Sequence, residues 1–246
     1  TELPAGVRLA TAKRGGGTVT RVEITREGLA RPRGRYVTLE MPSVSVLDER
    51  DTDVIETGAA ELRALLPPEG PVLVLGIGNR RVTADALGPR TAQKILVTMG
   101  PQHTLPVQGI RPVAALAPGV SGDTGLTLRQ LAAAMVDAVR PAALICVDSL
   151  CSAEAARLGR TIQFSDTGLH PADARHARHL DAAALGVPVI AAGIPTLMDA
   201  DEGADLVLTP RALDSVIAHG SALLAGILNR ALQPRLSVAQ LCWLTG

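Results

Sequence analysis

A buried apolar run that ends in a glycine turn constrains the fold of this chain more than any other feature. Residues 72–79 read Val-Leu-Val-Leu-Gly-Ile-Gly-Asn, with no polar break before the first glycine. Such a run is typical of a strand covered on both faces, and the glycines indicate a turn in which the backbone passes close to another group. A helical pattern follows from about Asp85 to Met99. Together these elements predict the first unit of an open parallel α/β sheet.

Length and composition limit the class of protein. With 246 residues, 47% of them hydrophobic, the chain can bury a sizeable core, and we expect a single α/β domain over residues 1–246. The 24 basic and 24 acidic residues balance, which argues against direct binding to nucleic acid or to an anionic membrane. The apolar stretches are shorter than the roughly 20 residues that cross a bilayer, and no signal pattern is present. We therefore expect a soluble intracellular protein.

Strand and helix patterns alternate along the rest of the chain. Residues 1–17 end in three glycines and predict a flexible lead-in, and residues 18–25 and 35–41 predict an antiparallel hairpin at the edge of the sheet. Helices are expected at 51–66, 126–139, 172–185 and 210–232, and further strands at 111–117, 142–147, 161–165, 187–192 and 206–208. The predicted fold class is α/β, a mostly parallel sheet with helices on both faces and an antiparallel amino-terminal edge hairpin.

Three carboxylates follow predicted strands within a few residues: Asp85, Asp148 and Asp166. Because ligands of open α/β sheets bind outside the carboxyl ends of the strands, we expect all three at that edge. Each one alone is equally consistent with a helix cap or a turn. Two neighbouring carboxyls, however, cannot easily both ionise, so one keeps a proton while the other stays charged. Such a pair suits acid–base hydrolysis, in which one group activates water and the other hydrogen-bonds the carbonyl.

Other motifs give weaker signals. His170, four residues after Asp166, could carry protons or, with Asp85 and Asp148, bind a divalent metal, although a loop histidine bonded to backbone fits equally well. The Gly76-x-Gly78 turn lacks the third glycine of a dinucleotide fingerprint, and neither a phosphate-loop lysine motif nor a Gly-x-Ser-x-Gly elbow occurs. The three cysteines form no Cys-x-x-Cys pair and fit small core residues, with Cys151 nearest to the predicted site.

The chain resembles the spore germination protease family, the endopeptidases that degrade small acid-soluble spore proteins. The similarity covers about residues 18–232 in the family's order. The segments that carry it are 34–40, 76–79 with 82–89, 118–120 with 124–125, 147–150, 162–171, 185–196 and 208–210. The chain departs from the family in residues 172–176, where members carry a glycine-rich continuation, and in lacking a long insertion after Ala200.

The resemblance implies an atypical aspartic-type peptidase with a fold like that of hydrogenase maturation proteases. By position, the catalytic aspartates would be Asp85 and Asp148, with Asn79, Asp166 and His170 as supporting or substrate-binding residues. It also implies spore proteins as substrates, a homo-oligomeric, tetrameric zymogen, no cofactor, and a location in the cytoplasm of the spore core.

Two other functions fit the same scaffold. The related maturation proteases imply a metal-dependent endopeptidase, in which Asp85, Asp148 and His170 would hold the metal. A non-catalytic protein could instead use the turn at 76–79 and the loop at 118–125 to hold an anion or a peptide, because glycine turns before helices offer free N–H groups.

Overall fold

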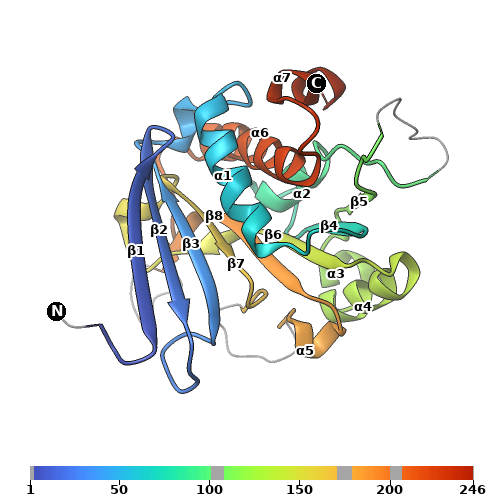
Figure 1. Ribbon diagram of the computed structural model, residues 1–246, viewed down its shortest axis with the longest axis horizontal. Coiled ribbons are helices and arrows are strands. Elements are labelled where there is room, and N and C mark those ends of the chain that lie inside the picture. Colours follow the sequence, from blue (N-terminus) through green and yellow to red (C-terminus); the bar gives the residue numbers. More distant parts are fainter. Residues whose placement is uncertain (1–2, 101–107, 171–178, 200–206, 246) are drawn as a thin grey trace.

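The fold is built on one mixed sheet of nine strands, seen in the computed structural model, which describes residues 3–100, 108–170, 179–199 and 207–245 (Figure 1). The strands are β1 (Val7–Arg14), β2 (Gly17–Ile24), β3 (Gly34–Glu40), β4 (Val72–Gly76), β5 (Val113–Leu116), β6 (Ala143–Cys151), β7 (Thr161–Ser165), β8 (Val189–Asp199) and β9 (Val207–Leu208). The α-helices are α1 (Thr52–Leu65), α2 (Leu87–Ala92), α3 (Ser121–Thr124), α4 (Leu128–Val139), α5 (Ala182–Leu185), α6 (Leu213–Leu232) and α7 (Val238–Thr245). Short 3-10 helices are η1 (Val44–Val46), η2 (Thr83–Asp85) and η3 (Ala155–Arg157).

The sheet has a parallel half and an antiparallel half. Its strand order is β1-β2-β3-β7-β8-β6-β4-β5, and β9 adds to β8 outside this path. Neighbours among β5, β4, β6 and β8 run parallel, whereas β7, β3, β2 and β1 continue the sheet in antiparallel pairs. The predicted α/β class, parallel at its centre with an antiparallel amino-terminal edge, is confirmed.

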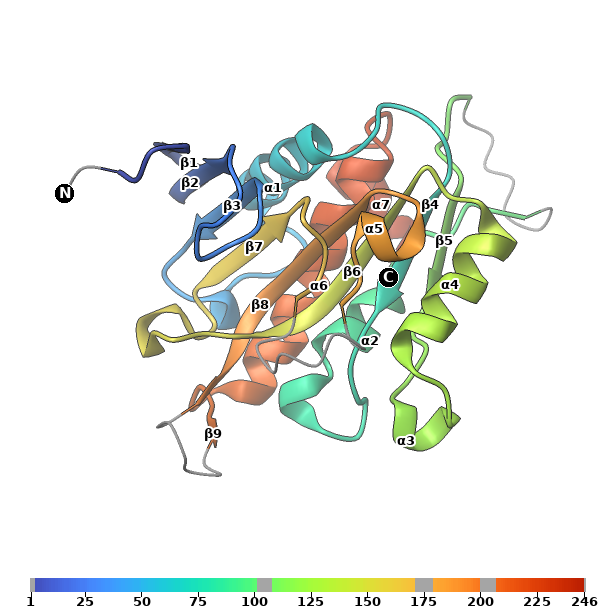
Figure 2. The same cartoon turned by 90° about the horizontal axis from the view of Figure 1, so that it is seen from below.

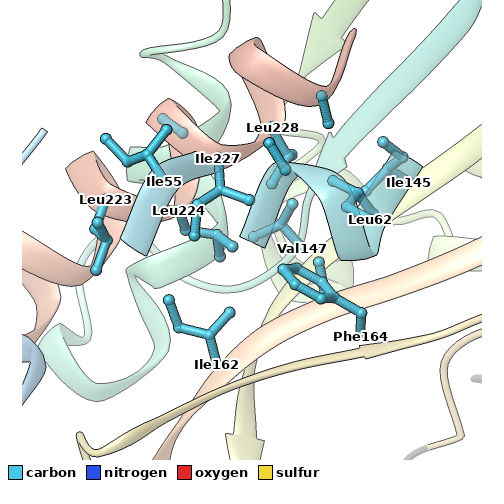
Figure 3. Close-up of a cluster of buried hydrophobic side chains, with 14 of the residues drawn as sticks. Ile55, Leu62, Ile145, Val147, Ile162, Phe164, Leu223, Leu224, Ile227 and Leu228 are labelled. Atoms are coloured by element: carbon cyan, nitrogen blue, oxygen red, sulfur yellow. The ribbon is translucent and has the colours of Figure 1, made fainter. Parts of the chain in front are cut away.

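Side chains of the central strands alternate between two apolar layers. In β4, Val72 and Val74 belong to the layer under α1 and α6, and Leu73 and Leu75 to the layer under α4. Figure 3 shows the first layer, in which Leu62 of α1 and Leu228 of α6 gather with strand residues such as Ile145. This two-sided burial explains the unbroken apolar run in the sequence.

Helices cover the two faces unequally. On one face, α1, α2 and α6 lie over the sheet, and α1 spans the antiparallel half (Figure 1). On the other face, α3, α4 and α5 lie beside the parallel half. Figure 2, seen from that side, shows β7 and β8 without any described helix in front of them. One face of the antiparallel half, and of β8 beside it, is therefore open.

The amino-terminal region differs from the prediction. The flexible lead-in expected over residues 1–17 is wrong for residues 7–14, which form β1 and pair along their full length with β2. Gly15 and Gly16 both have positive φ, 56° and 74°, and close a two-residue hairpin turn, so the glycines mark a tight turn and not a linker. The expected hairpin of residues 18–25 and 35–41 is present as β2 and β3, but β1 forms the edge of the sheet.

Several element bounds also differ. The helix expected from Asp85 to Met99 is only the six residues of α2, and α6 begins at Leu213 instead of Pro210. Two strands run further than their apolar runs, β6 to Cys151 and β8 to Asp199, because each continues along the other beyond the buried core. The helix expected at 172–185 falls partly outside the described residues, and within them only Ala182–Leu185 is helical, as α5. α7 was not predicted.

One helix, α6, is long and apolar enough to cross a membrane by length and composition. In the fold it packs against α1 and α2, and 67% of its most apolar 18-residue window is buried. A central core helix meets the same criteria, so this feature is explained by packing.

The contact between α1 and α6 should dominate stability. Leu62 is fully buried there, whereas Leu9 on β1 is 52% exposed. We expect Leu62→Ala to lower the free energy of unfolding by about 2–5 kcal/mol, because it removes buried methyl groups and leaves a cavity. The matched Leu9→Ala should change it by less than about 0.5 kcal/mol. Urea denaturation of both variants checks this, and equal losses would contradict the assigned core.

Candidate active site

The end of β4 packs closely against α2 because both carry a glycine at the contact. A Cβ on Gly76 would lie 2.2 Å from the Gly88 carbonyl oxygen, and one on Gly88 would lie 2.3 Å from the Val147 carbonyl oxygen. Side chains at either position are therefore excluded by contact. This close approach holds the start of α2, and the η2 turn before it, over the junction of β4 and β6.

Asp85 ends the η2 turn and points back toward the glycine loop. Its Oδ2 accepts a hydrogen bond of 2.7 Å from the backbone N–H of Asn79. Gly78 makes this possible, since its φ is +124° and a Cβ there would lie 2.0 Å from the Asp85 carbonyl oxygen. Burial raises the pKa of Asp85, and the Asn79 N–H partly opposes that rise. Asn79 thus supports the carboxylate through its backbone, while its side chain accepts from the N–H of Arg81.

Asp148 lies within β6, two residues beyond the fully buried Cys146. Burial raises the pKa of Asp148 to about 8, and the negative charge of Asp85 adds to the rise. The backbone N–H of Ser149, 2.7 Å from Asp148 Oδ1, opposes it. The charge of Asp85 therefore acts on Asp148, and near neutral pH Asp148 holds a proton. The arrangement offers Asp148 as an acid and Asp85 as a base.

Asp166 does not join this pair, contrary to the predicted convergence of three carboxylates. β7 runs antiparallel to β8, so its carboxyl end points away from the edge that holds Asp148. By strand spacing, Asp166 lies roughly 14 Å from Asp148, about three residues back and two strands across. Its carboxylate accepts from the backbone N–H and the Nε of Arg35, at 2.6 and 2.7 Å. This contact joins β7 to β3.

His170 lies on the open side of the sheet. Its Nε2 is 2.7 Å from the Thr167 carbonyl oxygen, and its ring meets that of His179 edge to face at 4.9 Å. Within the described ranges, no three His, Cys, Asp or Glu side chains form a group that could hold a metal, and Asp85, Asp148 and His170 are not such a group.

A cavity of about 730 Å³ opens on the uncovered face of the antiparallel half. Asp148 lines its inner end, and Asp85 is not among its described lining residues. Strands β3, β7 and β8 provide its floor, and the segment 167–170 and the loop before β3 provide its walls. Its size exceeds that of a single side chain and suits a polymeric ligand.

One supporting contact escaped the sequence analysis. Thr196 is fully buried in β8, and its hydroxyl donates to the Ala84 carbonyl, 2.9 Å away, beside Asp85. The signal was a polar residue after Pro195, beyond the point where the apolar run ended. Cys146, next to the site, is fully buried, and burial raises its pKa strongly, so it is unsuited to act as a nucleophile.

Comparison with known proteins decides the family. The sequence model of the germination protease family matches residues 2–202. The chain belongs to the germination protease family. The germination protease of Clostridium perfringens (strain SM101 / Type A) is 33% identical over 276 residues, covering 89% of this chain and 85% of that protein. The germination protease of Bacillus velezensis is 38% identical over 223 residues, covering 84% of this chain and 58% of that protein.

The resemblance to germination proteases noted in the sequence is thereby confirmed, and the protein is a germination-type endopeptidase, a hydrolase of peptide bonds. Among solved structures, a NiFe hydrogenase maturation protease from Thermococcus kodakarensis is similar with a TM-score of 0.46 and 18% identity, covering 70% of this chain and 98% of that one.

The protonated state of Asp148 predicts how stability depends on pH. Between the carboxyl's ordinary pKa of 3.8 and about 8, the native state binds more protons than the unfolded state, so stability falls as pH rises. Asp148→Asn removes this loss, and its melting temperature should exceed that of the wild type by an amount that grows to about 3 °C or more by pH 8.

Thermal melts of the wild type and Asp148→Asn at several pH values test this. Asp137→Asn, a change at an exposed position on α4, is the matched control and should follow the wild type. A difference between wild type and Asp148→Asn that stays constant across the series would show that Asp148 ionises normally.

Proposed function

We propose that this germination-type protease cleaves peptide bonds with Asp85 and Asp148 as an aspartic-type pair. The observation that carries the proposal is the contact of Gly88 with the Val147 carbonyl oxygen, which holds the turn that ends in Asp85 against the end of β6 next to Asp148. The charge of Asp85 accordingly adds to the rise in the pKa of Asp148. In this proposal ionised Asp85 takes a proton from water as the water attacks the carbonyl carbon. Neutral Asp148 hydrogen-bonds the carbonyl oxygen and stabilises its developing charge. As the C–N bond breaks, Asp85 gives the proton that it took from water to the leaving amine.

The proposal extends to substrate and setting. Small acid-soluble spore proteins are the proposed substrates, bound as unfolded segments in the cavity beside Asp148. The zymogen, the homo-oligomeric assembly and the action in the cytoplasm of the spore core are proposed with them, and no cofactor is required. Their support is the family to which the chain belongs.

Replacing either carboxyl should abolish cleavage without unfolding the protein. We expect Asp85→Asn and Asp148→Asn each to lower kcat/KM at least about 100-fold, because neither amide can act as an acid or a base. The assay follows fragments of a recombinant small acid-soluble spore protein by mass spectrometry, with and without EDTA, so that metal-dependent and metal-independent cleavage are distinguished.

Asp137→Asn is again the control and should retain wild-type activity, and circular dichroism checks that each variant is folded. Full activity in either active-site variant would refute the proposal that Asp85 and Asp148 form the catalytic pair. Intact spore protein with a stable complex would favour a binding protein on the same scaffold, and cleavage that EDTA abolishes would favour a metal-dependent enzyme.

The rate should depend on pH as a bell. Activity rises as Asp85 ionises, at a pH above its ordinary pKa, and falls as Asp148 loses its proton near pH 8. Both limbs belong to the coupled pair and not to one residue. Initial rates across the acidic to mildly basic range measure the profile, with the folded fraction recorded at each pH. A flat profile, or inactivation by iodoacetamide, would point to another mechanism.

A further inference from the structure

A row of paired residues crosses four strands at the cavity. Thr38 of β3 pairs with Gln163 of β7, and Gln163 pairs with Gly193 of β8. Gly193 in turn pairs with Asp148 of β6. Directly paired residues point to the same face of a sheet, so this row runs from the site straight across the open face.

This row and the one beside it form the floor of a trough, and the Leu150 side chain covers the position of Gly193 in it. A Cβ on Gly193 would lie 2.3 Å from the Asp148 carbonyl oxygen and 2.8 Å from Leu150 Cγ. The parallel row beside it holds Ala191, Ser165 and Tyr36, which pair in the same way. All three line the cavity, and so do Asp148, Gln163 and Thr38. A chain lying in the trough would therefore cross the strands and pass over Leu150 and over small and polar side chains.

A positioned arginine stands at the far end. The Tyr36 hydroxyl donates to the Pro32 carbonyl at 2.7 Å, which ties the loop before β3 to the sheet. The guanidinium of Arg31 lies over the Tyr36 ring, 5.5 Å from its centroid, and lines the cavity. Asp166, the nearby carboxylate, is already bonded to Arg35. Within the described part of the chain, Arg31 has no ion-pair partner.

We propose that Arg31, stacked on Tyr36, is a specificity residue that binds an acidic side chain of the substrate about four residues from the cleaved bond. This inference rests on the proposed function. From β6 to β3 the trough spans three strand spacings, roughly 14 Å, which an extended peptide covers in about four residues. A guanidinium held on an aromatic face presents its N–H groups to a carboxylate with little ordering cost.

Cleavage profiling of a random-sequence peptide library tests the inference. Mass spectrometry of the fragments gives the residue preference at each position around the cleaved bond. For the wild type we expect Asp and Glu to be enriched at one position, three to five residues from the bond on one side. Arg31→Glu should reverse that preference toward Lys and Arg and lower kcat/KM for a peptide with the acidic residue about tenfold or more.

Arg33→Glu is the matched control, because Arg33 is exposed in the same loop, is not among the lining residues of the cavity, and the change alters net charge equally. It should leave the preference unchanged. Cleavage without an acidic preference, or a preference that Arg31→Glu leaves intact, overturns the role of Arg31 while the protease activity stands. A wild type that releases no fragments overturns both the proposed function and this inference.

Discussion

Close contact between backbones at the end of β4 is the constraint on which the site depends. Gly76 and Gly88 touch carbonyl oxygens of neighbouring elements, and Gly78 touches that of Asp85. Any Cβ at these positions would push α2 or the η2 turn away from the sheet. Asp85 would then move away from Asp148, and the two carboxyls would no longer share one environment. The glycines thus contribute to the proposed chemistry only by keeping Asp85 close to Asp148.

The same geometry has an energetic cost. A carboxyl whose pKa is raised to about 8 is held in its neutral form by an environment that disfavours its charge. At neutral pH that environment reduces stability relative to a solvated carboxylate. The large two-layer core, with α6 buried along most of its length, compensates for this cost. A desolvated group of this kind persists where many surrounding contacts hold it in place. Such groups are typical of functional sites.

At β7 the pairing changes from parallel to antiparallel, and this change separates the strand that carries Asp148 from the open face that holds the cavity. In the parallel half, β4 and β6 are covered on both faces, and β6 carries Asp148. The antiparallel half is covered on one face by α1 and open on the other, where the cavity lies. Since β7 points its carboxyl end away from the site, Asp166 serves the fold by its contact with Arg35. Chemistry and substrate contact can therefore occupy adjoining parts of one continuous sheet.

The sequence by itself determined the parallel strands, the strand–glycine–helix unit and the two aspartates, because each has a local signature: an unbroken apolar run, a glycine pair, a carboxyl directly after a strand. It did not determine the direction of β7, the pairing of β1 or the extension of β6 and β8. A strand alternates its side chains with a period of two whichever way it runs, and its partner lies far away in the chain. Only the tertiary structure decided that Asp166 lies away from the pair and that the row from Thr38 to Asp148 is in register, since both depend on contacts between distant segments.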